Sequence, residues 1–166
     1  MDRPKTCKPH RRLEIFRHED ATHLDDATMH YAPMDEETLA GMQKVAAVGA
    51  QEGLAEKTLV LFKEPRPDGM SIMYAWFKSN YVLPRHNHDA DCAYYILAGS
   101  LKMGSQTLGK GDGMFVPAGA GYTYEVGPDG LELLEVRNAA HFNIDFKGNN
   151  EGHWDRIAEV YRTKRS

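Results

Sequence analysis

The stretch PRHNHDADCAYYILAG, residues 84–99, decides the fold. It contains His86 and His88, separated by one residue, and Cys92 follows four residues after His88. Side chains alternate along a strand, so both imidazoles point to the same face. Two such rings can both reach a metal ion that lies about 2 Å from each ring nitrogen. The stretch therefore predicts a metal site on a strand edge, although two surface histidines near a turn are the alternative interpretation.

The segments around this stretch predict an all-β domain. From Thr58 onward the chain is a series of short β-branched or aromatic runs, mostly bounded by Gly, Pro, Asp or Asn, which is typical of antiparallel sandwiches and barrels. EPRPDG (64–69) and VGPDG (126–130) have the composition of turns. The expected strands are TLVLFKE (58–64), SIMYAWFKSNYVL (71–83), CAYYILAGSLKMG (92–104), GMFVPAG (113–119), YTYEVG (122–127) and LELLEVRNA (131–139).

A helix is expected on each side of the strands. Residues 35–52 carry apolar side chains at helical spacing behind an acidic first turn, although Gly41 and Gly49 oppose a helix. Residues from about 151 to 163 would place Trp154, Ile157 and Tyr161 on one face. We therefore expect an N-terminal arm over 1–34, which would wrap a partner subunit, and a single domain over 35–166 with its barrel at about 58–145.

Composition narrows the classes of function. The chain has 166 residues and a net charge of −4, which argues against nucleic acid as a partner. We interpret the basic residues near the start, Arg3, Lys5, Lys8, Arg11 and Arg12, as a solvated tail. No apolar run is long enough for a membrane span or a signal peptide, and the two cysteines, Cys7 and Cys92, make no disulfide framework. A cytoplasmic protein with no membrane partner is expected.

Two motifs in this sequence resemble the conserved motifs of the cupin superfamily. The first runs from His86 and His88 through Cys92 to Gly99, and the second, GDGMFVPAGAGYTYEV, begins at Gly111 and includes Tyr122. The resemblance covers about residues 58–138. It implies a cupin-type double-stranded β-helix, that is, a jelly-roll barrel, with an N-terminal and a C-terminal helix.

The sequence departs from the family at two metal positions. The family set is three histidines and one glutamate, but Cys92 stands at the glutamate position and Tyr122 at the last histidine position. Cysteine dioxygenases, which are also cupins, likewise carry a cysteine there, cross-linked to a tyrosine. Cys92 is therefore open to three roles: pocket packing, metal ligation or a cross-link.

Strand alternation and the resemblance together suggest the rest of the site. Tyr94, Tyr122 and Tyr124 would point inward with Cys92, and His141 is a further candidate ligand. Tyr74 and Trp76 would line the same cavity, which suits a small aromatic or ring-shaped ligand. Asp89 and Asp91 are expected to form the turn, and Arg137 to make a surface ion pair rather than to hold a substrate carboxylate.

These features predict a metal-dependent enzyme that acts, as a homodimer, on a small organic substrate, with an aromatic molecule as one candidate. The first choice is iron-assisted, dioxygenase-like oxygen chemistry with Fe(II); Zn, Ni, Mn or Cu are alternative metals. The metal candidates are His86, His88, Tyr122, Cys92 and His141, and the catalytic candidates are Tyr122, Tyr94, Tyr124 and Cys92. The alternatives are a non-catalytic small-ligand-binding module and a cupin lyase, isomerase or decarboxylase.

Overall fold

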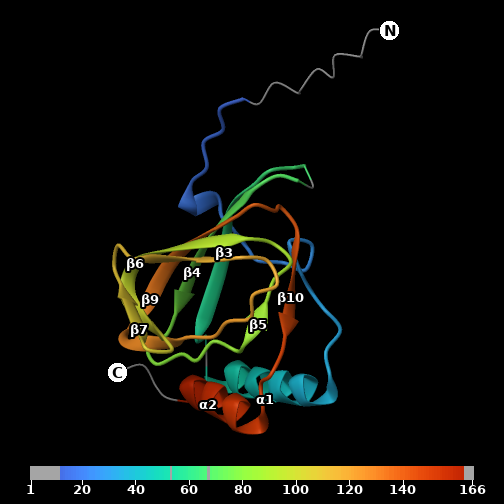
Figure 1. The fold of residues 1–166 in the computed structure, drawn as a ribbon, viewed down its shortest axis with the longest axis vertical. Helices are drawn as coiled ribbons and strands as arrows, with labels where there is room; N and C mark the ends of the chain where they lie inside the picture. Colours follow the sequence, from blue (N-terminus) through green and yellow to red (C-terminus); the bar gives the residue numbers. More distant parts are fainter. Residues whose placement is uncertain (1–11, 53, 67, 163–166) are drawn as a thin grey trace.

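Mostly antiparallel strands and two α-helices form the fold (Figure 1). The structure is a computed structural model that describes residues 12–52, 54–66 and 68–162; Cys7 and the first four basic residues of the tail lie outside this range. The elements are η1 (His18–Asp20), β1 (Thr22–His23), β2 (Met29–Tyr31), α1 (Glu36–Glu52), β3 (Glu56–Lys63), β4 (Ser71–Phe77), β5 (His86–Asn87), β6 (Cys92–Met103), β7 (Gln106–Gly109), β8 (Gly113–Val116), β9 (Glu125–Arg137), β10 (Phe142–Phe146) and α2 (Glu151–Arg162).

Two sheets form the body of the fold. The larger has the strand order β1-β3-β4-β9-β6-β7, with β8 also paired to β6, and the smaller has the order β2-β10-β5. The two strands that precede α1 pair with later strands of the same chain: β1 with β3, and β2 with β10. The segment from Thr22 to Tyr31 is therefore anchored on its own subunit and is not the loose arm expected from the sequence.

Strand β9 corrects the expected turn at residues 126–130. It runs without interruption from Glu125 to Arg137, and residues 127–130 bulge out of its pairing with β6, because Gly99 lies opposite Leu131 while Leu101 lies opposite Val126. Gly99 and Gly130 both have positive φ, and a Cβ on Gly99 would lie 1.9 Å from the Gly130 carbonyl oxygen. Glycine thus allows the two backbones to meet at a bulge in one long strand.

Alternation along β4 decides which side chains face the interior. Met73, Ala75 and Phe77 are buried, so Tyr74 and Trp76 between them point to the other face. The Tyr74 hydroxyl donates a hydrogen bond to Glu132 there, at 2.9 Å. The expectation that Tyr74 and Trp76 line the cavity is therefore wrong, because strand alternation turns them away from it, and Met73 and Phe77 line it instead.

Helices α1 and α2 lie side by side beneath the sheets (Figure 1). Gly41, which looked unfavourable for a helix, is the contact point: a Cβ there would lie 2.3 Å from ring atoms of Trp154. Trp154, Ile157 and Tyr161 are buried on one face of α2, as their spacing predicts. Among the described residues, neither helix is long and apolar enough to cross a membrane.

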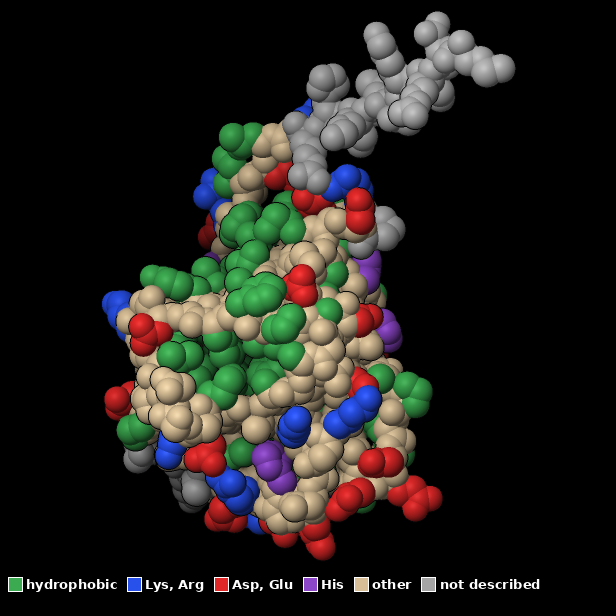
Figure 2. Space-filling model, viewed as in Figure 1, with side chains coloured by type: hydrophobic (Ala, Val, Ile, Leu, Met, Phe, Trp, Pro, Cys, Tyr) green, Lys and Arg blue, Asp and Glu red, His purple; other side chains and the backbone are tan. Residues whose placement is uncertain are grey.

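Part of the outer surface is apolar. Figure 2 shows hydrophobic side chains gathered in the middle of one face, with charged side chains mostly towards its margins. The exposed large hydrophobic side chains include Tyr95, Phe115 and Val136 on three neighbouring strands of the larger sheet. The homodimer expected from the sequence stays a prediction.

The contact between Gly41 and Trp154 yields a prediction about stability. Gly41→Ala should lower the free energy of unfolding by about 1–3 kcal/mol, because overpacking the helix contact outweighs the roughly 1 kcal/mol gain in helix propensity. Gly152→Ala in α2 is the control, since its Cβ would meet nothing closer than 3.6 Å, and it should not destabilise the protein. Urea unfolding of both variants measures the difference; an equally stable Gly41→Ala protein would contradict the proposed helix packing.

Candidate functional site

His86 and His88 are held inside the fold by strand pairing on two sides. The backbones of His86 and Tyr122 exchange hydrogen bonds of 3.2 and 3.0 Å, and His86 also lies opposite Phe146 in β10. The exposed fractions are 4% for His86 and 6% for His88, whereas Asn87 between them is only partly buried. Alternation therefore places both imidazoles on the interior face, with ring centroids 4.8 Å apart.

The aspartates beside the pair hold its loop in place. The side chains of Asp89 and Asn143 each accept a hydrogen bond from the other residue's backbone N–H, at 2.8 and 3.0 Å. Asp91 accepts from the backbone of Ala118 and from the side chain of Asn138. Both aspartates are thus used structurally, as their position near a turn suggested.

Each histidine has one ring nitrogen bound to a backbone carbonyl. The Nδ1 of His86 lies 2.7 Å from the carbonyl oxygen of Pro84, and the Nδ1 of His88 lies 2.5 Å from that of Asn143. A carbonyl oxygen only accepts, so both Nδ1 atoms carry the proton and both Nε2 atoms carry a lone pair that can accept a hydrogen bond or bind a metal. Burial, with a smaller contribution from the positive Arg137, lowers the pKa of His86 to about 4 and that of His88 to about 2, so both rings are neutral at pH 7.

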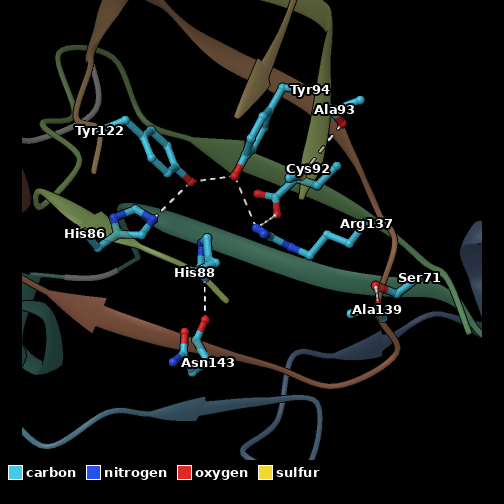
Figure 3. A network of polar contacts seen from close by, with 11 residues as sticks. Ser71, His86, His88, Cys92, Ala93, Tyr94, Tyr122, Arg137, Ala139 and Asn143 are labelled. Carbon is cyan, nitrogen blue, oxygen red and sulfur yellow. Dashed lines mark hydrogen bonds and ion pairs between the residues drawn. The ribbon is translucent and has the colours of Figure 1, made fainter. Parts of the chain in front are cut away.

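A chain of hydrogen bonds runs from His86 into the interior (Figure 3). The Tyr122 hydroxyl lies 3.0 Å from the Nε2 of His86 and 2.5 Å from the Tyr94 hydroxyl, and the Nη2 of Arg137 donates to Tyr94 at 3.1 Å. Because the His86 Nε2 must accept, the donors all run one way: Arg137 to Tyr94, Tyr94 to Tyr122, Tyr122 to His86. Burial, joined by the nearby charge of Glu135, raises the pKa of both phenols, so they remain protonated.

Arg137 is an interior residue. Its exposed fraction is 2%, and its Nη2 donates to Glu135 at 2.8 Å. The expectation of a surface ion pair is therefore wrong. The alternation of Leu131 and Leu133 continues inward through Glu135 and Arg137, and this signal in the sequence could have placed both charges inside.

These groups border a cavity of about 640 Å³. His86, His88, Tyr122, Tyr124 and Arg137 line it, with Glu135 beside them. Its other walls are mainly apolar and come from both sheets and both helices, including Met42, Val45, Phe142, Ile144, Phe146 and Trp154. A small number of polar groups in an apolar cavity of this size is typical of small-molecule sites.

Two of the residues predicted for the site lie apart from this cavity. The Cys92 thiol is buried 3.7 Å from the carbonyl oxygen of the neighbouring Ala93, and burial raises its pKa to about 12, so it stays a thiol. His141 is exposed, with its Nδ1 2.6 Å from the Ala27 carbonyl oxygen. Neither residue is among those that line the cavity, whereas Tyr94 reaches the site through its hydrogen bonds to Tyr122 and Arg137.

Three side chains at the cavity offer donor atoms of the kind that a divalent metal takes. The Nε2 lone pairs of His86 and His88 are suitable ligands, and their Nδ1–H···O=C bonds are the outer contacts that commonly orient metal-binding histidines. The Tyr122 hydroxyl is the third donor within reach of His86. In the part of the chain that the structure describes, no group of three or more His, Cys, Asp or Glu side chains is placed to hold a metal.

The buried histidines yield a prediction for protein treated with a chelator. Between pH 6.5 and 4 the unfolded chain protonates both histidines while the folded chain does not, so stability must fall as the pH falls. As the pH falls through this range, each histidine should lower the free energy of unfolding by up to about 1.4 kcal/mol per pH unit. Urea unfolding at pH 7 and pH 5 should therefore show a larger loss for the wild type than for the His86→Gln/His88→Gln variant. Equal losses would mean that the two rings titrate normally in the folded protein.

Comparison with known proteins locates the chain by its fold. No family model matches the sequence, and no curated protein matches it. Among solved structures, the polyketide cyclase RemF from Streptomyces resistomycificus is 18% identical, with 64% of this chain and 84% of that chain covered and a TM-score of 0.52. KdgF from Halomonas sp. is 18% identical over 51% of this chain and 81% of its own, with a TM-score of 0.43. An oxalate decarboxylase from Bacillus subtilis is 15% identical over 52% and 26%, with a TM-score of 0.46.

RemF, whose TM-score is above 0.5, is a cupin-type protein, and the match covers 64% of this chain. At such identities the similarity concerns the fold alone. It agrees with the two sequence motifs and with the arrangement of mostly antiparallel strands and two flanking helices. The chain has a cupin-type jelly-roll fold.

Proposed function

We propose that the protein is a cupin-type enzyme that converts a small organic molecule, with an apolar or aromatic body, in the cavity beside His86 and His88. The observation that carries the proposal is the pair of neutral imidazoles whose Nε2 lone pairs adjoin a chain of protonated phenols at one cavity of about 640 Å³. Lone pairs and protonated hydroxyls in one enclosed site are what proton transfer and metal ligation require.

In this proposal His86, His88 and Tyr122 hold a divalent metal. Iron is our first choice, and Zn, Ni, Mn or Cu are alternatives. A metal bound there supplies Lewis-acid polarisation of a substrate oxygen and, if it is iron, dioxygenase-like oxygen chemistry. Neutral imidazole suits each of these metals, whereas the protonated thiol of Cys92 and the exposed ring of His141 do not add to the set.

The chain's own residues would bind and orient the substrate and handle its protons. Tyr122 and Tyr94 stay protonated, so they act as hydrogen-bond donors or acids rather than as bases. The Nε2 atoms of the histidines are weak bases, because burial lowers the ring pKa to about 4 in His86 and about 2 in His88, so at pH 7 they offer lone pairs to a metal or a hydrogen-bond donor rather than take up a proton. Tyr124, which lines the cavity, and the apolar walls would keep water from the reacting groups.

A second candidate function is a non-catalytic module that binds a small ligand in the same cavity. It is favoured by the donor set, which within the described residues lacks a carboxylate or thiolate that would complete a metal site with the two histidines. A lyase, isomerase or decarboxylase would use the same residues with different chemistry.

Metal content tests the proposal directly. Wild-type protein, purified without added metal and then incubated anaerobically with Fe(II) or Zn(II), should retain close to one ion per chain by mass spectrometry of the metals. His86→Gln and His88→Gln should each reduce retention at least tenfold, because removing one of few ligands disrupts the site. His141→Gln and His30→Gln, which change exposed histidines, should retain the metal.

Two results would contradict this assignment. Retention that survives in both His86→Gln and His88→Gln would place the metal elsewhere in the chain. A wild-type protein that retains none of the metals after reconstitution would favour the binding module instead.

Tyr122 yields a separate spectroscopic prediction. Burial raises the pKa of its phenol, so ionisation requires a bound metal. Protein loaded with ferric iron should then show a visible phenolate-to-iron absorption band that Tyr122→Phe lacks. Tyr124→Phe is the matched control, since this buried tyrosine also lines the cavity but makes no contact with His86 among those the structure records, and the band should survive in it. A band that persists in Tyr122→Phe would remove Tyr122 from the ligand set.

A further inference from the structure

Arg137 has hydrogen-bonding capacity that the protein does not use. Its guanidinium carries five N–H donors on three nitrogens. One of these nitrogens, Nη2, donates to Tyr94 and to Glu135. Its Nε and Nη1 are buried and have no hydrogen-bond partner among the described residues. Buried polar groups are nearly always satisfied, so two unpartnered nitrogens on one cation call for a partner that the chain itself does not provide.

The surroundings of Arg137 limit where that partner can be. Its guanidinium carbon lies 4.3 Å from the ring centroid of Phe142, so an aromatic ring covers one face of the group. Phe142, Glu135 and Arg137 all line the cavity, and Figure 3 shows the guanidinium end of Arg137 directed towards Tyr94 and His88. Arg137 thus borders the cavity, and a ligand there would approach the guanidinium from a side that Phe142 does not cover.

We infer that Arg137 is the binding site for an anionic oxygen group, a carboxylate above all, on the molecule that occupies the cavity. The inference deepens the proposed function and rests on it for the claim that this cavity takes a substrate. A guanidinium pairs with a carboxylate through charge-assisted hydrogen bonds, which Nε and Nη1 are free to donate. The substrate class is thus a small organic acid whose apolar or aromatic body lies against the remaining walls.

The other charged residues along the cavity include Asp26 and a second cation, Lys57, which lies opposite Trp76 and so towards the end of β4 away from Arg137. One carboxylate oxygen of Glu135 accepts a hydrogen bond from the Nη2 of Arg137, which leaves Nε and Nη1 without a partner among the described residues. Asp25 is engaged by the backbone of Thr28, and Glu56 accepts from the Tyr81 hydroxyl at 2.5 Å. Glu56 and Arg137 lie at opposite ends of β4, since they border Phe77 and Ser71 respectively. An acid would therefore bind with its carboxylate at the Arg137 end, away from Glu56.

The test compares two probes of nearly the same shape, benzoate and the neutral benzamide. Isothermal titration calorimetry of the full chain with EDTA present excludes binding of the carboxylate to a metal. Wild-type protein should bind benzoate at least tenfold more tightly than benzamide. Glu135→Gln/Arg137→Gln, which removes the ion pair as a unit and leaves no buried charge unpaired, should lose that preference.

The control variant is Glu125→Gln/Arg156→Gln. It removes an ion pair of the same residue types that is exposed and lies outside the cavity, so the preference for benzoate should persist. Arg137→Lys provides a second test that keeps the charge. It should weaken the binding of benzoate without changing the binding of benzamide, because an ammonium lacks the planar donors of a guanidinium.

Equal binding of the two probes by wild-type protein would overturn the inference. A preference that survives in Glu135→Gln/Arg137→Gln but disappears in His88→Gln would place the anion at the histidines and would overturn it as well. Failure of the metal assignment is recognised separately, because the probes are measured without metal: a protein that retains no metal but prefers benzoate would refute only the metal site.

Discussion

The interior of this protein is organised around a buried cation. Arg137 lies at 2% exposure, where an unpaired charge would be very costly, so the surrounding elements must compensate it. Glu135 supplies the opposite charge from the same strand, Tyr94 supplies an acceptor from β6, and Phe142 supplies an aromatic face from β10. The same positive charge helps to keep His86 and His88 neutral. One charge thus connects both sheets and adds to the effect of burial, which keeps the histidines neutral.

Long strand pairing fixes these partners in position. In the register of β6 and β9, Cys92 lies opposite Arg137 and Tyr94 opposite Glu135. The bulge at Gly99 and Gly130 allows the pairing to continue past residues that would otherwise end the strand. The placement of Tyr94, Glu135 and Arg137 is therefore a property of the two paired strands, and neither strand alone could produce it.

The sequence was informative wherever a local pattern sufficed. Both helices, most long strands and the inward direction of His86 and His88 follow from periodicity and from the two motifs. Strands β1 and β5, of two residues each, have no local signal, because their conformation depends on partners far along the chain. The turn expected at residues 126–130 was wrong for a related reason: its Pro and Gly are compatible with a bulge, and the pairing with β6 decides between the two.

The side-chain assignments show the same limit. Tyr74 and Trp76 are aromatic and would suit the interior, yet they alternate with the buried Met73 along β4 and so point outward. Only the pairing of β4 with its neighbouring strands shows which face of the strand is inside. Arg137 looked like a surface residue because charge normally indicates exposure. Its neighbours in space, Tyr94 and Phe142, come from other strands, so no sequence window contains the reason for its burial.

The helix pair that closes the cavity has a consequence for how this protein can diversify. Met42 and Val45 of α1 and Trp154 of α2 form one wall, whereas the histidines, tyrosines and Arg137 belong to the strands and their connections. Substitutions in the helix wall would reshape the space around the body of a ligand and leave the polar groups in place. Preference among ligands and the chemistry applied to them can therefore change in separate mutational steps, with the contact at Gly41 as the main restriction on how far the wall can move.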